Sequence, residues 1–179
     1  MRKLPVMVAV VMIVGAMALS ARAADDAAKE QPQSPEGWKL IWNDEFDKPG
    51  LPDPEKWGYE EGFVRNNEKQ YYTKERKENA RVEDGNLVIE SRKENYTEGN
   101  RDADYTSASV TTKGKASWNH GGKGTRIEAR AKIPTGRGMW PAIWMLGLGD
   151  GKQRFGWPAC GEIDILENVG FDPDKVHAN

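Results

Sequence analysis

The feature that most constrains the fold is an alternation of apolar and charged residues in a chain repeatedly interrupted by glycine and proline. In residues 126–133, the apolar residues Ile127, Ala129, Ala131 and Ile133 share one parity and charged residues occupy the other. This is the period-2 pattern of a strand with one buried face. The 19 Gly and 10 Pro of the 179 residues disfavour long helices. The sequence therefore predicts many short strands joined by turns.

Further strands are predicted from β-branched and aromatic residues bounded by Gly, Asn or Asp, at residues 38–42, 87–92 and 105–112. Asp84-Gly85-Asn86 and Gly121-Gly122 are turn signals between them. Residues 139–146 are apolar on both parities, which predicts a strand covered on both faces. Many short antiparallel strands favour an all-β fold, a β-sandwich of two sheets.

Charge and cysteine content exclude several function classes. The 26 Lys and Arg nearly balance 28 Asp and Glu, with a net charge of −2, which gives no electrostatic reason to expect nucleic acid or an anionic membrane as a partner. One cysteine, Cys160, cannot form an internal disulfide, so the core must hold the fold. We expect Cys160 to be a small buried thiol rather than a nucleophile or part of a zinc site.

The N-terminus has the pattern of a secretory signal peptide at residues 1–23. Arg2 and Lys3 precede an apolar stretch, and Ala21-Arg22-Ala23 is a small-x-small cleavage pattern. The apolar stretch is shorter than the roughly 20 residues that span a bilayer, so a retained anchor is the less favoured alternative. Residues 24–36 hold no large apolar residue and predict a flexible linker, and residues 37–179 predict the folded domain.

Three acids in an otherwise apolar strand form the most informative segment. Glu162, Asp164 and Glu167 lie among isoleucine and leucine residues in GEIDILENVG, where an unpaired carboxylate would be costly to bury. Period 2 places Glu162 and Asp164 on one face but turns Glu167 to the other. One extra residue in a β-bulge between Asp164 and Glu167 restores the parity, and bulges are enriched beside active sites.

Two carboxylates that face a shared space are the groups that glycosidic-bond cleavage requires, one as the proton donor and one as the nucleophile or base. Asp164, between them, would hydrogen-bond Glu162 and separate the charges. This chemistry requires no metal or organic cofactor. Two alternatives remain open for the acids: an exposed edge strand without function, and a calcium site, although their spacing matches no EF-hand loop.

The segments around the acids resemble glycoside hydrolase family 16, most closely its bacterial laminarinase members, which are endo-β-1,3-glucanases. The resemblance rests on five motifs in the family's order, from about Gly37 to the last residue: WNDEF, NNEKQYYT (ending at Thr73), RIEARAKIP, GRGMWPAIWML and GEIDILE. It implies a concanavalin-like jelly-roll β-sandwich whose concave face binds sugar. It also implies a mechanism that retains anomeric configuration.

By position, Glu162 matches the family's nucleophile, Glu167 its general acid/base and Asp164 the residue that supports the nucleophile. Trp140 and Trp144 match aromatic residues that line the cleft, although either could instead be a core residue. A polar loop near the substrate in the family matches Asn67, Glu68 and Gln70, for which a solvated turn is the alternative. A structural calcium ion, known in parts of the family, is left open.

The resemblance implies a secreted, extracellular or periplasmic, hydrolase that cleaves β-glucan at β-1,3 or β-1,3/1,4 linkages. An agarase- or carrageenase-type galactanase, a non-catalytic carbohydrate-binding module and a structural surface protein are the alternatives. The expected partner is the polysaccharide, with no membrane partner after signal cleavage, and a complete protein is expected to be a monomer. Because family members have further strands after the carboxylate strand, we expect residues 37–179 to be an incomplete domain, at best weakly stable and inactive alone.

Overall fold

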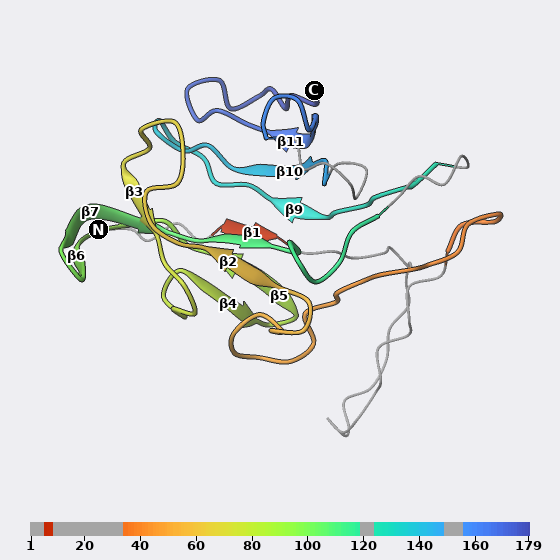
Figure 1. Ribbon diagram of the computed structural model, residues 1–179, viewed down its shortest axis with the longest axis horizontal. Helices are drawn as coiled ribbons and strands as arrows, with labels where there is room; N and C mark the ends of the chain where they lie inside the picture. Colours follow the sequence, from red (N-terminus) through yellow and green to blue (C-terminus); the bar gives the residue numbers. More distant parts are fainter. Residues whose placement is uncertain (1–5, 9–33, 119–123, 149–155) are drawn as a thin grey trace, which may run out of the picture. The chain divides into compact units, whose positions relative to one another are not determined.

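The computed structural model describes residues 6–8, 34–118, 124–148 and 156–179, and its regular secondary structure there is entirely β (Figure 1). The predicted all-β class is confirmed. The strands are β1 (Val6–Val8), β2 (Gly58–Glu60), β3 (Gln70–Tyr72), β4 (Ala80–Glu83), β5 (Asn86–Ile89), β6 (Arg92–Glu98), β7 (Arg101–Ser107), β8 (Ser109–Thr111), β9 (Ala131–Lys132), β10 (Ala142–Leu146) and β11 (Glu162–Glu167).

The chain divides into two compact units. The larger unit is Val8–Ala131 and contains β2 to β8. The second, here called the carboxylate unit, comprises Met1–Met7 and Lys132–Asn179 and contains β10 and β11. The short strands β1 and β9 lie at the boundaries between the units in the sequence.

The turn signal at Asp84-Gly85 forms a two-residue hairpin turn in the larger unit. β4 and β5 pair antiparallel, with Glu83 opposite Asn86. Asp84 and Gly85 have φ angles of 51° and 71°, the left-handed conformation that Asp-Gly turns adopt readily. The predicted turn is confirmed, and β5 covers residues 87–89 of the strand expected at residues 87–92.

Three further strand pairings are found in the larger unit. β6 and β7 form an antiparallel hairpin with an irregularity between Lys93 and Tyr96. β3 adds to β7 in parallel, and β2 pairs antiparallel with β8. The strand expected at residues 105–112 is therefore divided between β7 and β8, with Ala108 between them.

A small apolar core joins this unit. Phe46, Val82 and Leu87 are buried and pack together, with Trp57, Ile89 and Val110 against them. The Phe46 and Trp57 rings stack with centroids 6.1 Å apart. The Trp57 indole also donates a hydrogen bond to the Asp44 carboxylate at 2.7 Å, so the buried aspartate has a partner.

A buried polar network joins Asn79, the residue before β4, to Thr106 on β7. The Asn79 amide donates to the Glu90 carbonyl at 3.0 Å and to the Thr106 hydroxyl at 2.9 Å. The Thr73 hydroxyl donates to the Asn79 side chain at 2.9 Å. Arg76 reaches both Asn79 and Glu94. Because the three uncharged side chains are at most 1% exposed, each loses water on folding and depends on these partners.

Two strands predicted from the sequence are wrong. Residues 38–42 form no strand, and Trp38, Leu40 and Ile41 are exposed there. Of residues 126–133 only Ala131–Lys132 is a strand, β9. Alternation indicates which side chains share a face, but a strand also needs hydrogen bonds to a neighbouring strand. None is assigned to the described residues 124–130.

Several expectations fall on parts that the structure does not describe. Apart from β1, the predicted signal peptide lies outside the described residues, as do residues 24–33 of the linker and the Gly121-Gly122 turn. In the described ranges, no helix has the length and apolarity that crossing a membrane requires.

Glu94 is expected to stabilise the protein in a pH-dependent way. The hydrogen bond from Arg76 holds the pKa of Glu94 at about 2, below its ordinary value of 4.5, and Thr106 contributes. Because the folded-state pKa is the lower one, this stabilisation is present above pH about 4.5 and is lost as the pH falls towards 2. Glu94→Gln should lower the free energy of unfolding by about 1–2 kcal/mol at pH 7, and the difference should shrink across that interval in thermal melts.

Glu78→Gln is the matched control, because Glu78 pairs with the same arginine at 3.7 Å while its side chain is 55% exposed. Exposed pairs contribute about 0–1 kcal/mol. Equal losses of unfolding free energy in Glu94→Gln and Glu78→Gln at pH 7 would contradict the stabilising role of the hydrogen bond from Arg76 to Glu94.

Candidate active site

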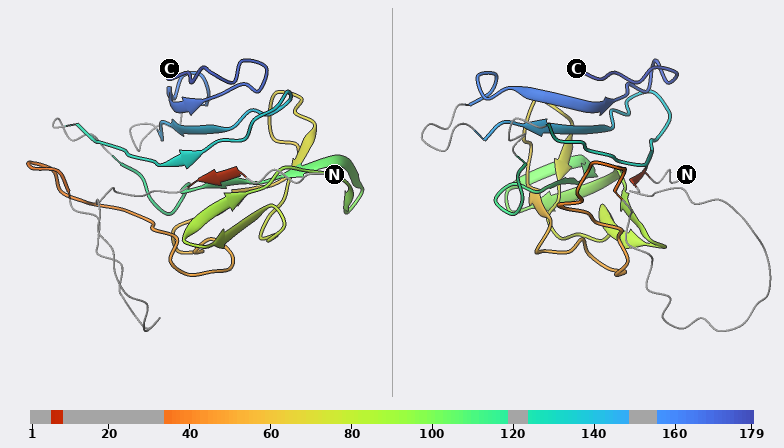
Figure 2. Two further views of the ribbon diagram at one scale, coloured as in Figure 1. Left: turned by 180° about the vertical axis from the view of Figure 1, so that it is seen from behind. Right: turned by 90° about the vertical axis from the view of Figure 1, so that its right-hand side faces the viewer.

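The register between β10 and β11 contains the predicted bulge. The two strands pair antiparallel, with Ile143 opposite Leu166 and Trp144 opposite Asp164. Ile165 has no partner on β10, so it is the extra residue of the bulge. Figure 2 shows the two strands side by side near the C-terminus.

The bulge gives the three acids one face. Glu162, Asp164 and Glu167 lie opposite Leu146, Trp144 and Ala142, respectively. The three partners alternate along β10, so they point to one side of the ladder, and the paired acids point to the same side. The expectation that one extra residue restores the parity of Glu167 is confirmed, and Trp144 shares the face of the acids.

The segment 177–179 pairs with the other edge of β11 and shows the same one-residue shift. Glu167 forms a bridge with His177, with both backbone hydrogen bonds made at 2.9 and 2.8 Å. Asp164 exchanges backbone hydrogen bonds with Asn179 at 2.9 and 3.2 Å. The three residue steps from Asp164 to Glu167 on β11 therefore lie opposite two residue steps on β10 and two on the segment 177–179. Ile165 is the additional residue with respect to both neighbours.

Two tryptophan indoles donate to the outer acids. Trp140 Nε1 lies 3.1 Å from Glu167 Oε1, and Trp157 Nε1 lies 2.6 Å from Glu162 Oε2. Both indole rings are largely exposed, at 66% and 70%. Glu162 is exposed, and Glu167 is half-buried. Each outer carboxylate therefore has one oxygen with an N–H donor on the surface of this unit.

Sequence reasoning included Trp140 but missed Trp157. The signal available for Trp157 was an aromatic residue followed by proline, immediately before the acidic strand. Cys160, in the same turn, is half-buried rather than buried, and its Sγ lies 3.4 Å from the Gly161 carbonyl oxygen.

Asn168 fixes the segment that follows the acids. Its side chain is 1% exposed and donates to the carbonyls of Pro173 and Lys175 at 3.2 and 2.7 Å. Its backbone N–H donates to the Pro141 carbonyl at 3.2 Å. Asn168 therefore connects the end of β11 to the loop that leads to His177.

Two glycines allow the backbone to approach closely around the strand pair. A Cβ at Gly147 would collide with the Cys160 carbonyl oxygen, and a Cβ at Gly170 would collide with that of Gly136. Gly170 also donates to the Met139 carbonyl at 2.8 Å. These positions admit no side chain for a steric reason, because the obstacle is backbone.

The polar loop predicted to bind substrate belongs to the larger unit. The Glu68 carboxylate accepts a hydrogen bond from the Tyr72 hydroxyl at 3.0 Å, and the Gln70 amide donates to that hydroxyl at 2.9 Å. Burial raises the pKa of Tyr72. Asn67 has a φ of 53° in the preceding turn. These contacts give the loop a local structural role, and its contact with substrate stays a prediction.

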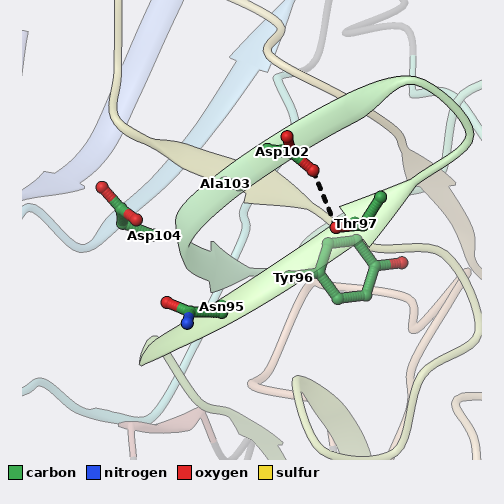
Figure 3. Close-up of a pocket in the computed structure, with 6 residues that line it drawn as sticks. All are labelled: Asn95, Tyr96, Thr97, Asp102, Ala103 and Asp104. Carbon is green, nitrogen blue, oxygen red and sulfur yellow. Dashed lines mark hydrogen bonds between the residues drawn. The ribbon is translucent and has the colours of Figure 1, made fainter.

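A pocket of about 420 Å³ lies along the β6–β7 hairpin of the larger unit. It is lined by Asn95, Tyr96, Thr97, Asp102, Ala103 and Asp104 (Figure 3). Thr97 donates to Asp102 at 2.7 Å across the hairpin. None of the predicted site residues lines this pocket.

No set of three or more His, Cys, Asp and Glu side chains in the described ranges is placed to hold a metal ion. The acids are arranged instead as separate carboxylates along one strand. Two outer carboxylates with an acid between them can transfer a proton and attack a carbon, and neither step needs a metal.

Comparison with known proteins shows which family this chain resembles. A family model described as "XgeA-like, catalytic GH16 domain" matches residues 57–177. The β-glucanase of Rhodothermus marinus is 56% identical over 145 residues, covering 78% of this chain and 47% of that protein. The glucan endo-1,3-β-glucosidase of Cryptopygus antarcticus is 44% identical over 142 residues, covering 78% of this chain and 49% of that protein.

The fold also matches a solved structure. The X-ray structure of the laminarinase from Rhodothermus marinus aligns with a TM-score of 0.69 at 53% identity, covering 79% of this chain and 54% of that one. The expected jelly-roll β-sandwich class is confirmed by this match. The chain spans about half the length of the relatives that it matches.

The close approach at Gly170 gives a steric prediction. Gly170→Ala should lower the free energy of unfolding by about 1–3 kcal/mol, because the added methyl group forces backbone apart in a packed turn. Gly156→Ala is the matched control, since nothing lies within 4 Å of its Cβ position. Chemical denaturation of both variants measures the effect. An equal loss of unfolding free energy in Gly170→Ala and Gly156→Ala would show that the close backbone contact at Gly170 does not cause the destabilisation.

Proposed function

The chain belongs to glycoside hydrolase family 16, and on that premise we propose that the protein hydrolyses β-glucan by a retaining double displacement. The observation that carries the proposal is the shared face of Glu162, Asp164 and Glu167, which the unpaired Ile165 produces. The relatives' names add support, since they include a β-glucanase and a glucan endo-1,3-β-glucosidase. The proposed linkage is β-1,3, with β-1,3/1,4 glucans as further substrates.

In this mechanism Glu162 is the nucleophile. One of its carboxylate oxygens attacks the anomeric carbon and forms a glycosyl ester as the glycosidic bond breaks. Asp164, two residues along on the same face, lies between the two reacting glutamates and supports Glu162. A water molecule then releases the sugar with a second inversion, so the product keeps the anomeric configuration of the substrate.

Glu167 is the general acid and base. The hydrogen bond from Trp140 occupies Oε1, which leaves Oε2 as the atom that holds the transferable proton. Glu167 gives this proton to the leaving oxygen and in the second step takes a proton from water. The bridge to His177 and the anchoring of Asn168 hold its backbone in place.

The aromatic and polar residues around the acids are proposed to bind the sugar chain. Trp140 and Trp144 offer ring faces to pyranose rings, Trp144 from the strand position opposite Asp164. Asn67, Glu68 and Gln70 are proposed to contact the glucan from the larger unit. We further propose that the protein is secreted after cleavage of residues 1–23 and acts as a monomer, without a cofactor in its chemistry.

The two glutamates can be tested separately in the full-length protein. Glu162→Gln should reduce the release of reducing sugar from laminarin, a β-1,3-glucan, to background. Glu167→Gln should lower the rate by about 10²–10⁴-fold. Thermal melts of both variants should match the parent, because neither side chain is buried.

Glu55→Gln, an exposed glutamate in a turn of the larger unit, is the control and should keep full activity. Product sizing on laminarin, lichenan, agarose and carrageenan fixes the substrate class. Glucan binding without any hydrolysis by the parent protein would instead favour a carbohydrate-binding module.

A further inference from the structure

The hydrogen bond between Trp157 and Glu162 has no role in the mechanism described so far. Trp157 Nε1 lies 2.6 Å from Glu162 Oε2, a short distance for an N–H···O bond to a carboxylate. The indole ring is 70% exposed, so core packing does not account for its position. Among the residues that the structure describes, the Trp157 side chain hydrogen-bonds to Glu162.

The turn that carries Trp157 is held by the backbone, independently of that bond. Cys160 N–H donates to the Gly156 carbonyl at 3.2 Å, and Gly161 N–H donates to the Pro158 carbonyl at 3.0 Å. The backbone N–H of Gly147, immediately after β10, donates to the Gly161 carbonyl at 3.3 Å. The two backbones also approach closely here, since a Cβ at Gly147 would collide with the Cys160 carbonyl oxygen. The indole N–H is therefore presented from a turn connected to both strands.

We propose that Trp157 is a positioning residue for the nucleophile Glu162, an inference that rests on the proposed function. Its N–H occupies Oε2 and stops rotation of the carboxylate, which leaves Oε1 free to attack. Oε1 forms a bond to the anomeric carbon as the bond to the leaving oxygen breaks, and the leaving oxygen takes the proton of Glu167. Water then restores the Glu162 carboxylate, and Glu167 recovers a proton. Trp157 exchanges no atom in either step.

The outer carboxylates thus have matching donors with different consequences. Trp140 fixes the group that transfers a proton, and Trp157 fixes the group that forms a bond to carbon. A misplaced nucleophile slows bond formation even where the leaving group needs no protonation. A substrate whose leaving group needs no protonation therefore separates the role of Trp157 from that of Trp140.

The probe is 2,4-dinitrophenyl 2-deoxy-2-fluoro-β-laminaribioside, whose leaving group departs without acid assistance and whose fluorine stabilises the ester on the nucleophile. In the full-length protein, Trp157→Phe retains an aromatic face but removes the N–H. The labelling rate constant at saturation should fall about tenfold or more. On laminarin, kcat should fall to a similar extent while KM stays within about twofold. Trp38→Phe, an exposed tryptophan in the larger unit, is the control and should leave both rates unchanged.

The outcomes separate the inference from the function on which it rests. Labelling of the parent at a residue other than Glu162, or no labelling, overturns the proposed nucleophile. Labelling of Glu162 at the same rate in the parent and Trp157→Phe overturns the positioning role alone, as does a change confined to KM, which would assign Trp157 to sugar binding. If Trp157→Phe melts below the parent, 3-benzothienylalanine at position 157 keeps the ring shape without the N–H and is measured in its place.

Discussion

The hydrogen-bonded register of β11 with its neighbours determines where the three acids point. Side chains alternate along a strand, so Glu162 and Glu167 would face opposite sides of a regular ladder. Ile165 is unpaired, so β11 has two residues between Asp164 and Glu167, where β10 and the segment 177–179 each have one between the paired positions. Because both edges have the same mismatch, the bulge is a property of the whole local sheet and cannot be removed by a shift of one neighbour.

The surroundings of this strand preserve that register by steric and polar constraints rather than by a large apolar core. Gly147 and Gly170 admit no side chain where backbone segments meet. The buried Asn168 satisfies two loop carbonyls at the end of β11. The larger unit uses the same means, since Asn79, Thr73 and Thr106 are buried and bonded to each other. Such networks specify one arrangement, because each unpaired alternative leaves a buried polar group unsatisfied.

Sequence patterns predicted the features that depend on local rules. The Asp84-Gly85 turn follows from the conformations available to its residues, and the bulge follows from three acids that would not otherwise share a face. The strand at residues 38–42 was wrong, because composition does not reveal whether a partner strand is present. Asn168, Gly170 and Trp157 were missed because their roles depend on atoms brought close only by folding. Trp157 lies next to Glu162 because a turn reverses the chain between them, which no spacing rule indicates.

The account can be tested most directly at the extra residue itself. Deletion of Ile165 leaves two residue steps between Asp164 and the glutamate that follows it. The paired residues on β10 and on the segment 177–179 are also two steps apart. The ladder can then be regular, and the acids still share one face. The initial rate of laminarin hydrolysis by the folded deletion variant is the measurement. The account predicts that substantial activity remains, because the acids still share one face. A folded deletion variant as inactive as one without the Glu167 carboxylate would contradict the bulge as the origin of the active face.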